Sequence, residues 1–121
     1  MNASILSAFQ KEFSSASHIE WNAEKDYARV IFVYNNSRVA AYYNYDGVLL
    51  GTARNITFSQ LPLSLIKELS VRNLATAFYD ITEVTKNDIT NYYMTVEKKN
   101  KKFLVCASAS GSMEIIKKIK E

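Results

Sequence analysis

Short reversal signals constrain the fold of this 121-residue chain more than any other feature. Asn35-Asn36 and Asp46-Gly47 interrupt alternating runs of side chains in the first half, and Lys99-Asn100 and Ser110-Gly111 do the same in the second half. Asn, Asp and Gly tolerate the positive φ angles that tight hairpins require. We therefore expect antiparallel hairpins with two-residue turns, whose side-chain faces follow from the turn positions.

Two short amphipathic helices are predicted at a spacing of 60 residues. In residues 2–13, apolar side chains recur about once per helical turn, and Asn2 or Ser4 can cap the start. In residues 61–74, Pro62 occupies the first turn, where no amide donor is needed. The apolar positions that correspond are Ile5, Leu6 and Phe9 in the first helix and Leu65, Ile66 and Leu69 in the second.

Each predicted helix precedes a long alternating run that is typical of about four antiparallel strands. The run ends at Gly47 in the first copy and at Gly111 in the second, a shift of 64 residues, so the second copy holds about four extra residues within 82–90. We expect a single domain of two repeats, about 1–57 and 58–121, because one short helix covers little sheet and pairing two units enlarges the shared core. The predicted class is α+β: one twisted sheet of about eight strands with both helices on one face.

The turns also assign side chains to the two faces of the sheet. On one face, bulky and small apolar residues lie opposite one another, as expected beneath a helix. These predicted core pairs are Phe32 with Val39, Val30 with Ala41, Ala28 with Tyr43, Val96 with Phe103, Met94 with Val105, and Tyr92 with Ala107.

The opposite face is predicted to be open. In the first half it carries Tyr27, Arg29, Ile31, Val33, Arg38, Tyr42 and Leu49, and in the second half Asn91, Tyr93, Thr95, Glu97, Lys102, Leu104 and Cys106. The first set is more apolar and aromatic than solvation requires, which is typical of protein-binding surfaces. The alternative is that these side chains cover one another on a strongly twisted sheet or face a second copy of the chain.

The register of the last hairpin is left open by the sequence. A two-residue turn at Ser110-Gly111 would place Glu114 and Lys118 on the same face as Val105, which a buried surface does not accept. A bulge or a longer turn near Ser112 would instead move three apolar residues inward: Met113, Ile115 and Ile119. The last residues, 115–121, show an amphipathic strand pattern, with a short helix as the alternative.

Composition argues against several function classes. The net charge of +3 is mild for a nucleic-acid-binding domain, and the densest basic stretch, 97–102, fits a hairpin tip where lysines discourage edge pairing. No apolar run is long enough to span a membrane. His18 is the sole histidine and is expected at a helix-to-strand junction, while Cys106, the sole cysteine, fits a small apolar strand residue. Without a nucleophile motif or a phosphate-binding glycine loop, we expect neither an enzyme nor a cofactor.

Three segments resemble those of the PepSY-like periplasmic proteins, which are related in shape to the beta-lactamase inhibitor protein. They are "SAFQKEFSSASHIEW" at 7–21, "YNYDGVLLG" at 43–51 and "LPLSLIKEL" at 61–69. The second copy departs from the pattern, since Ile81 stands where a second tryptophan is expected and Ser110 replaces the turn aspartate. The resemblance implies a helix and meander occurring twice in an exported, non-enzymatic protein.

The inhibitor relative uses its concave sheet against a partner protein, in a manner similar to the open face described above. The start of the chain, "MNASILSAFQKEF", lacks the pattern of a signal peptide, so a periplasmic or secreted location is implied by the resemblance only.

Together these observations indicate a non-enzymatic extracytoplasmic module that binds a protein or peptide. The residues expected to contact the partner are Tyr27, Arg29, Ile31, Tyr42 and Tyr93. The alternative is a carrier of small apolar ligands with a pocket between sheet and helices. The sequence carries no signal for an oligomeric state.

Overall fold

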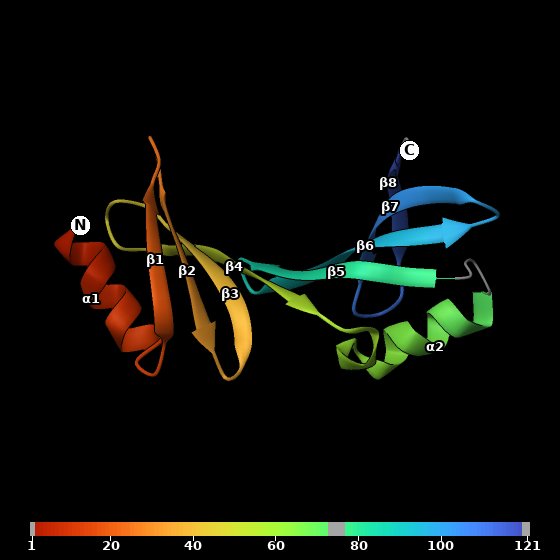
Figure 1. Cartoon of the computed structure of the whole chain (residues 1–121), viewed down its shortest axis with the longest axis horizontal. Helices are drawn as coiled ribbons and strands as arrows, with labels where there is room; N and C mark the ends of the chain where they lie inside the picture. Colours follow the sequence, from red (N-terminus) through yellow and green to blue (C-terminus); the bar gives the residue numbers. More distant parts are fainter. Residues whose placement is uncertain (1, 73–76, 120–121) are drawn as a thin grey trace. The chain divides into compact units, whose positions relative to one another are not determined.

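The computed structural model describes residues 2–72 and 77–119, which form a helix and four strands twice in succession (Figure 1). The first copy holds α1 (Ala3–Glu12), β1 (Ser17–Ala23), β2 (Ala28–Tyr34), β3 (Ser37–Tyr43) and β4 (Leu49–Ile56). After a short 3-10 helix, η1 (Phe58–Gln60), come α2 (Leu63–Arg72), β5 (Ala77–Lys86), β6 (Ile89–Lys98), β7 (Lys101–Ser108) and β8 (Met113–Ile119).

The eight strands follow their sequence order in one antiparallel sheet, which confirms the predicted α+β class. The chain divides into two compact units: Met1–Arg54 with Thr85–Asp88, and Asn55–Val84 with Ile89–Glu121. We call them unit 1 and unit 2. Strand β8 resolves the choice between strand and helix for residues 115–119, and the last two residues of that prediction, 120–121, lie outside the described residues.

Both helices begin and pack as the sequence predicts. The Asn2 side chain accepts a hydrogen bond from the Ile5 amide (3.1 Å), so Asn2 is the N-cap of α1. In α2, the Pro62 carbonyl accepts from the amide of Ile66 (3.0 Å). Each helix buries two residues one turn apart, and these occupy the corresponding positions: Ile5 and Phe9 in α1, Leu65 and Leu69 in α2.

The two-residue turns after β2 and β6 set the register of both units. Asn35 and Asn36 have φ of 50° and 64°, and Lys99 and Asn100 have φ of 50° and 63°. Positive φ at both central residues is the signature of a type I′ turn, whose twist matches that of the flanking strands. All six core pairs predicted from these turns are present in the structure.

The second copy is longer because of its first hairpin. Strands β5 and β6 with their turn span residues 77–98, whereas β1, β2 and their loop span 17–34, so the second copy has 22 residues where the first has 18. Another two-residue turn joins β5 to β6, with φ of 53° at Asn87 and 62° at Asp88. The predicted four-residue insertion within 82–90 is therefore an extension of this hairpin.

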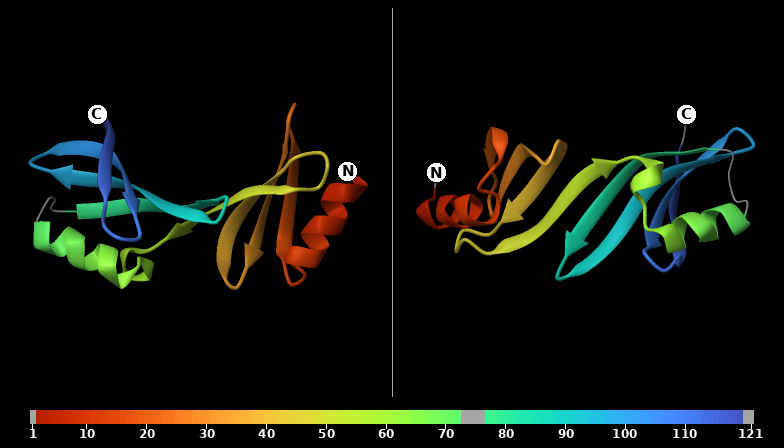
Figure 2. Two further views of the ribbon diagram at one scale, coloured as in Figure 1. Left: turned by 180° about the vertical axis from the view of Figure 1, so that it is seen from behind. Right: turned by 90° about the horizontal axis from the view of Figure 1, so that it is seen from below.

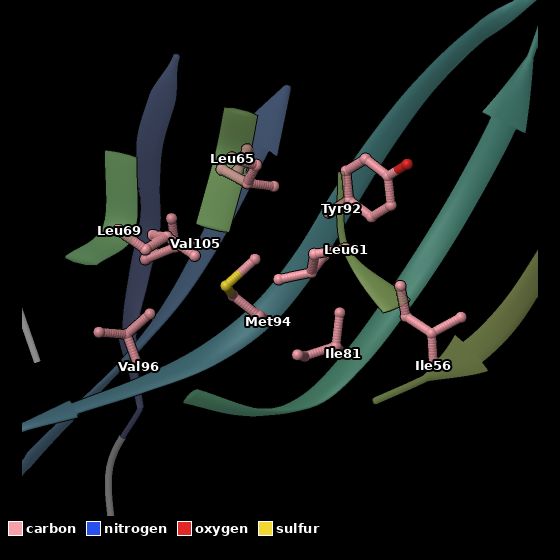
Figure 3. Close-up of a cluster of buried hydrophobic side chains, with 10 residues drawn as sticks. Ile56, Leu61, Leu65, Leu69, Ile81, Tyr92, Met94, Val96 and Val105 are labelled. Carbon is pink, nitrogen blue, oxygen red and sulfur yellow. The ribbon is translucent and has the colours of Figure 1, made fainter. Parts of the chain in front are cut away.

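Among the described residues, the buried side chains form two clusters, one in each unit, whereas we expected a shared core. In unit 1, the rings of Trp21 and Phe32 pack edge-on against Phe9 of α1, with centroids 5.2 Å and 5.0 Å away. In unit 2, Leu65 and Leu69 of α2 lie over β6 and β7 (Figure 3). Each helix thus packs on the strands of its own unit.

Tyr43 shows how a polar ring is accommodated in the unit 1 cluster. The residue is fully buried, and its hydroxyl donates a hydrogen bond to Glu12 Oε1 at the end of α1 (2.9 Å). Burial raises the pKa of Tyr43, and the neighbouring Glu12 carboxylate raises it further. The ring therefore stays neutral in the core with its hydroxyl paired.

The loops after β3 and β7 differ from the predicted two-residue turns. The amide of Asn44 donates to the Val48 carbonyl (3.0 Å), and that of Ser108 donates to the Ser112 carbonyl (2.9 Å), so each loop contains three residues. Such loops combine a type I turn with a left-handed third residue. Here that residue is Gly47 (φ 84°) or Gly111 (φ 104°).

The third residue of these loops shifts the strand that follows by one position. This shift moves one side chain to the opposite face of the sheet and sets the register of the last hairpin. Leu49 pairs with Tyr43 and packs against the unit 1 core, so its predicted place on the open face is wrong. In unit 2, Met113 pairs with Ala107 and Ile115 pairs with Val105 on the core side. Ile119 pairs with Lys102 on the other face, because a bulge follows Ile115.

Each three-residue loop rests on the helix of its own unit (Figures 1 and 2). Asn2 Nδ2 donates to the carbonyl of Tyr45 (3.1 Å), and Ser64 Oγ donates to the carbonyl of Ala109 (2.6 Å). Both carbonyls belong to the first residue of a loop. The two helices are thus connected to the loops of their own units at equivalent points by different side chains.

The type I′ turns give a first prediction. Replacing Asn36 by Val forces a β-branched residue into the left-handed region and should lower the free energy of unfolding by about 1–2 kcal/mol. Lys99→Gly should raise it by up to about 1 kcal/mol, since glycine adopts positive φ without strain. Urea denaturation measures both. Lys98→Gly, one residue earlier in β6, is the control and should destabilise; equal effects of Lys99→Gly and Lys98→Gly would contradict the turn assignment.

The loop glycines give a second prediction. A Cβ at Gly47 would lie 2.7 Å from the backbone oxygen of Ser4, whereas a Cβ at Gly111 would overlap Cγ of Glu68, which belongs to a flexible side chain that can move away. Gly47→Ala should therefore cost about 2–4 kcal/mol and Gly111→Ala about 1–2 kcal/mol. Thermal denaturation of both variants tests the order. Adding Glu68→Ala should recover part of the Gly111→Ala loss, and a reversed order would refute the packing of the loops.

Candidate functional site

The candidate site is the open face of unit 1, on the side of the sheet opposite α1. Along β2 and β3, fully buried residues alternate with half-buried or exposed ones, so the predicted division into two faces is confirmed for these strands. Neighbouring strands complete the face with Glu20 and Asn22 from β1 and with Gly51 and Ala53 from β4. From β2 and β3 come Arg29, Ile31, Val33, Arg38, Ala40 and Tyr42, with Tyr27 just before β2.

Two tyrosines form the aromatic part of this open face. The ring centroids of Tyr27 and Tyr42 are 6.0 Å apart with an interplanar angle of 51°. Tyr27 is 38% exposed, and Tyr42 is half-buried beside Gly51, which has no side chain. Tyr45 fixes the backbone at Tyr27, because its hydroxyl donates to the backbone carbonyl of Tyr27 (3.0 Å) and to that of Glu24. The rings are held by their surroundings and remain accessible.

Arg29 lies between the tyrosines and β1. It pairs with Tyr42 on one side and with Asn22 on the other. Its Nε is buried and has no hydrogen-bond partner among the protein atoms. Nearly all buried polar atoms in proteins are hydrogen-bonded, so the guanidinium of Arg29 retains hydrogen-bonding capacity that the described part of the chain does not use.

A hollow of about 280 Å³ lies next to Ile31 on the same face. Its walls include His18, Glu20, Val33 and Arg38, so it combines an apolar floor with charged edges. Pockets that enclose small molecules usually measure about 300–1,000 Å³. The hollow lies at the lower end of this range, a size that also suits a single side chain of a partner.

His18 and Glu20 were not among the residues that the sequence singled out for this face. His18 is the second residue of β1, the strand that follows α1, and has φ of 52° at a bulge between Ser17 and Glu20. Its Nδ1 lies 3.2 Å from Ser17 Oγ. The alternating pattern of "HIEWNA" is consistent with Glu20 on this face. No sequence pattern predicts the bulge at His18.

Tyr93 belongs to unit 2, whereas the other four predicted contact residues belong to unit 1. It is half-buried and pairs with Cys106, and a hydrogen bond with Cys106 raises the pKa of Tyr93. Around it the open face of unit 2 is more polar, with Glu97 accepting a hydrogen bond from the Tyr79 hydroxyl (3.2 Å) and pairing with Lys102. The structure brings together Tyr27, Arg29, Ile31 and Tyr42, and gives Tyr93 a different setting.

Potential metal ligands do not cluster in the described part of the chain. Within residues 2–72 and 77–119, no three His, Cys, Asp or Glu side chains gather in a group that could hold a metal ion. In the same ranges, none of the helices has the length and apolar character needed to cross a bilayer.

Comparisons with known proteins find similarity at the level of the fold. No protein-family model matches the chain, and no curated protein matches it by sequence. A DUF2874 family protein from Bacteroides uniformis superimposes with a TM-score of 0.81 at 15% identity, over 98% of this chain and 88% of that one. The fold of this chain is therefore similar to that of a solved DUF2874 family protein.

Two further solved structures are similar to this chain in fold. A BLIP-like protein from Bacteroides fragilis gives a TM-score of 0.78 at 17% identity, over 98% of this chain and 88% of that one. A protein from Bacteroides eggerthii described as a candidate periplasmic protein gives 0.78 at 18% identity, over 97% and 86%. The expected likeness to the beta-lactamase-inhibitor-protein fold is thus supported, whereas membership of the PepSY family stays a prediction.

The geometry of the open face predicts that its tyrosines contribute little to folding. Tyr27→Ala with Tyr42→Ala should lower the free energy of unfolding by about 1–2 kcal/mol, because both rings keep contact with water. Phe32→Ala, in the core between Phe9 and Phe13, should cost about 3–5 kcal/mol. Urea denaturation of the two variants provides the comparison. Equal losses would show that the tyrosines are structural.

Proposed function

We propose that this chain is a non-enzymatic extracytoplasmic module whose open face in unit 1 binds a protein or peptide. Tyr27 and Tyr42 act as the aromatic anchors, Arg29 supplies a hydrogen-bond donor and Ile31 borders the hollow. Tyrosine and arginine are enriched among the residues that dominate binding energy at protein interfaces. The alternative, that these side chains face a second copy of the chain, is an outcome of the experiment below.

One observation carries this proposal: the buried Nε of Arg29 has no partner inside the protein, and it lies beside two accessible aromatic rings. A guanidinium binds a carboxylate or a backbone carbonyl with fixed geometry. A partner that places an acceptor over Arg29 and an apolar side chain against Ile31 would contact the polar and the apolar part of the open face together.

The location outside the cytoplasm is supported by the comparisons. The Bacteroides eggerthii protein of similar fold is described as a candidate periplasmic protein, and the Bacteroides fragilis protein is described as BLIP-like.

The test is capture of partners from an envelope extract of the source organism, followed by affinity measurement with the purified partner. The variant Tyr27→Ala/Tyr42→Ala should bind at least about 30-fold more weakly than the wild type, the loss typical of two hot-spot residues. Arg29→Lys should weaken binding by about tenfold, because lysine cannot present the planar donor pair.

A matched control removes exposed apolar side chains elsewhere. Leu63→Ala/Val71→Ala changes two exposed residues of α2 and should bind like the wild type. If the tyrosine variant recovers the same proteins with the same affinity, the open face is not the binding site. If the captured partner is the chain itself, the face is a self-association surface.

A further inference from the structure

A second candidate site lies in unit 2, on the side of the sheet that α2 covers. A cavity of about 380 Å³ lies near the end of α2 and is lined by side chains of strands β5, β6, β7 and β8. Its size is within the range of pockets that enclose small molecules. The lining residues are Arg72, Phe78, Val96, Lys98, Phe103, Val105, Met113 and Ile115.

The register explains why the cavity wall is apolar. Val96 pairs with Phe103, and Val105 pairs with Ile115, so successive strands present apolar side chains to the same side. Phe78 is held in place by Phe58, with ring centroids 5.6 Å apart. Leu65 and Leu69 cover the adjacent part of this surface, as Figure 3 shows for Val105 and Met94, and leave the part nearer β8 open.

The cavity reaches solvent beside β8. Ile115 is 65% exposed although it lines the cavity, so an apolar wall meets water at the mouth. Exposed apolar surface that is concave and rimmed by polar groups is typical of a binding site. An apolar chain entering here would bury this wall.

Cations surround the apolar wall. Arg72 and Lys98 are part of the lining, and Lys118 pairs with Phe103 on the same side of the sheet. Arg72 contacts the Glu68 carboxylate (Nε to Oε2, 3.3 Å), but the side chains are 45% and 41% exposed, so this ion pair is weak and readily exchanged. The described charges near the cavity therefore favour an anionic ligand.

We propose that this cavity binds a single-chain anionic amphiphile, a medium-chain fatty acid, with its tail along the apolar wall and its carboxylate between Arg72 and Lys98. A methylene group is about as large as a water molecule, whose share of the liquid is about 30 Å³, so the cavity accommodates a tail of roughly ten carbons. This ligand class is independent of the protein partner of unit 1, because the two sites share no residue.

The primary test is calorimetric titration of the full chain with octanoate, nonanoate and decanoate below their critical micelle concentrations. The dissociation constant should fall about fourfold per added methylene, which corresponds to ~0.8 kcal/mol for each CH₂ removed from water. Decanol and decyltrimethylammonium should bind at least about tenfold more weakly than decanoate. Absence of decanoate binding at millimolar concentration, or equally tight binding of the cationic amphiphile, would overturn the proposal.

Two neighbouring isoleucines provide a matched pair of variants. Ile115→Glu places a carboxylate on the cavity wall, whereas Ile116→Glu makes the same change at the next residue, which is 47% exposed and is not part of the lining. Decanoate binding should weaken at least about tenfold in the first variant and stay unchanged in the second. Equal weakening in both would show that the cavity is not the site.

The charge on the rim has its own variant. Arg72→Gln/Lys98→Gln should reduce the affinity for decanoate to that for decanol, while the affinity for decanol stays the same. Vesicles of phosphatidylglycerol separate a free fatty acid from a lipid surface. Binding to the vesicles without binding to decanoate would assign the cations to a membrane and refute the fatty acid site.

Discussion

The structure depends on two backbone reversals in which both central residues have positive φ. Asn35 and Asn36 in unit 1, and Lys99 and Asn100 in unit 2, form type I′ turns without an extra residue. Because side chains alternate along a strand, a shift of one residue at either turn would exchange the two faces of the hairpin. The turns thereby decide that Phe32 lies beneath α1 and that Arg29 lies on the open face.

The second constraint is the three-residue loop that rests on each helix. Its glycine adopts positive φ and approaches the helix so closely that a side chain at that position would collide with Ser4 or Glu68. The first loop residue accepts a hydrogen bond from Asn2 in unit 1 and from Ser64 in unit 2. The two units thus reach the same arrangement of helix and loop with different side chains, which leaves their surfaces free to differ.

The two candidate sites lie on surfaces that differ between the two units. Unit 1 has an aromatic open face with Arg29 at its centre, and its helix-covered side is filled by aromatic packing of Phe9, Phe32 and Trp21. Unit 2 has a more polar open face, and its helix-covered side retains a cavity beside β8. We propose a macromolecular partner for the first surface and an anionic amphiphile for the second. The two repeats therefore carry their proposed sites on opposite faces of the same fold.

The sequence by itself determined the elements, the repeat and the faces of the central hairpins, because these depend on local properties: φ preferences at Asn35-Asn36, apolar periodicity in the helices and the alternation of side chains. The length of the loop after β3 is set by the hydrogen bond from Asn44 to Val48, and this length places Leu49 on the core side of the sheet. Only the tertiary structure decided the hollow beside His18, the buried Nε of Arg29 and the cavity beside Ile115. These features arise where side chains distant in the chain fail to fill space or to pair, and no local pattern encodes such a gap.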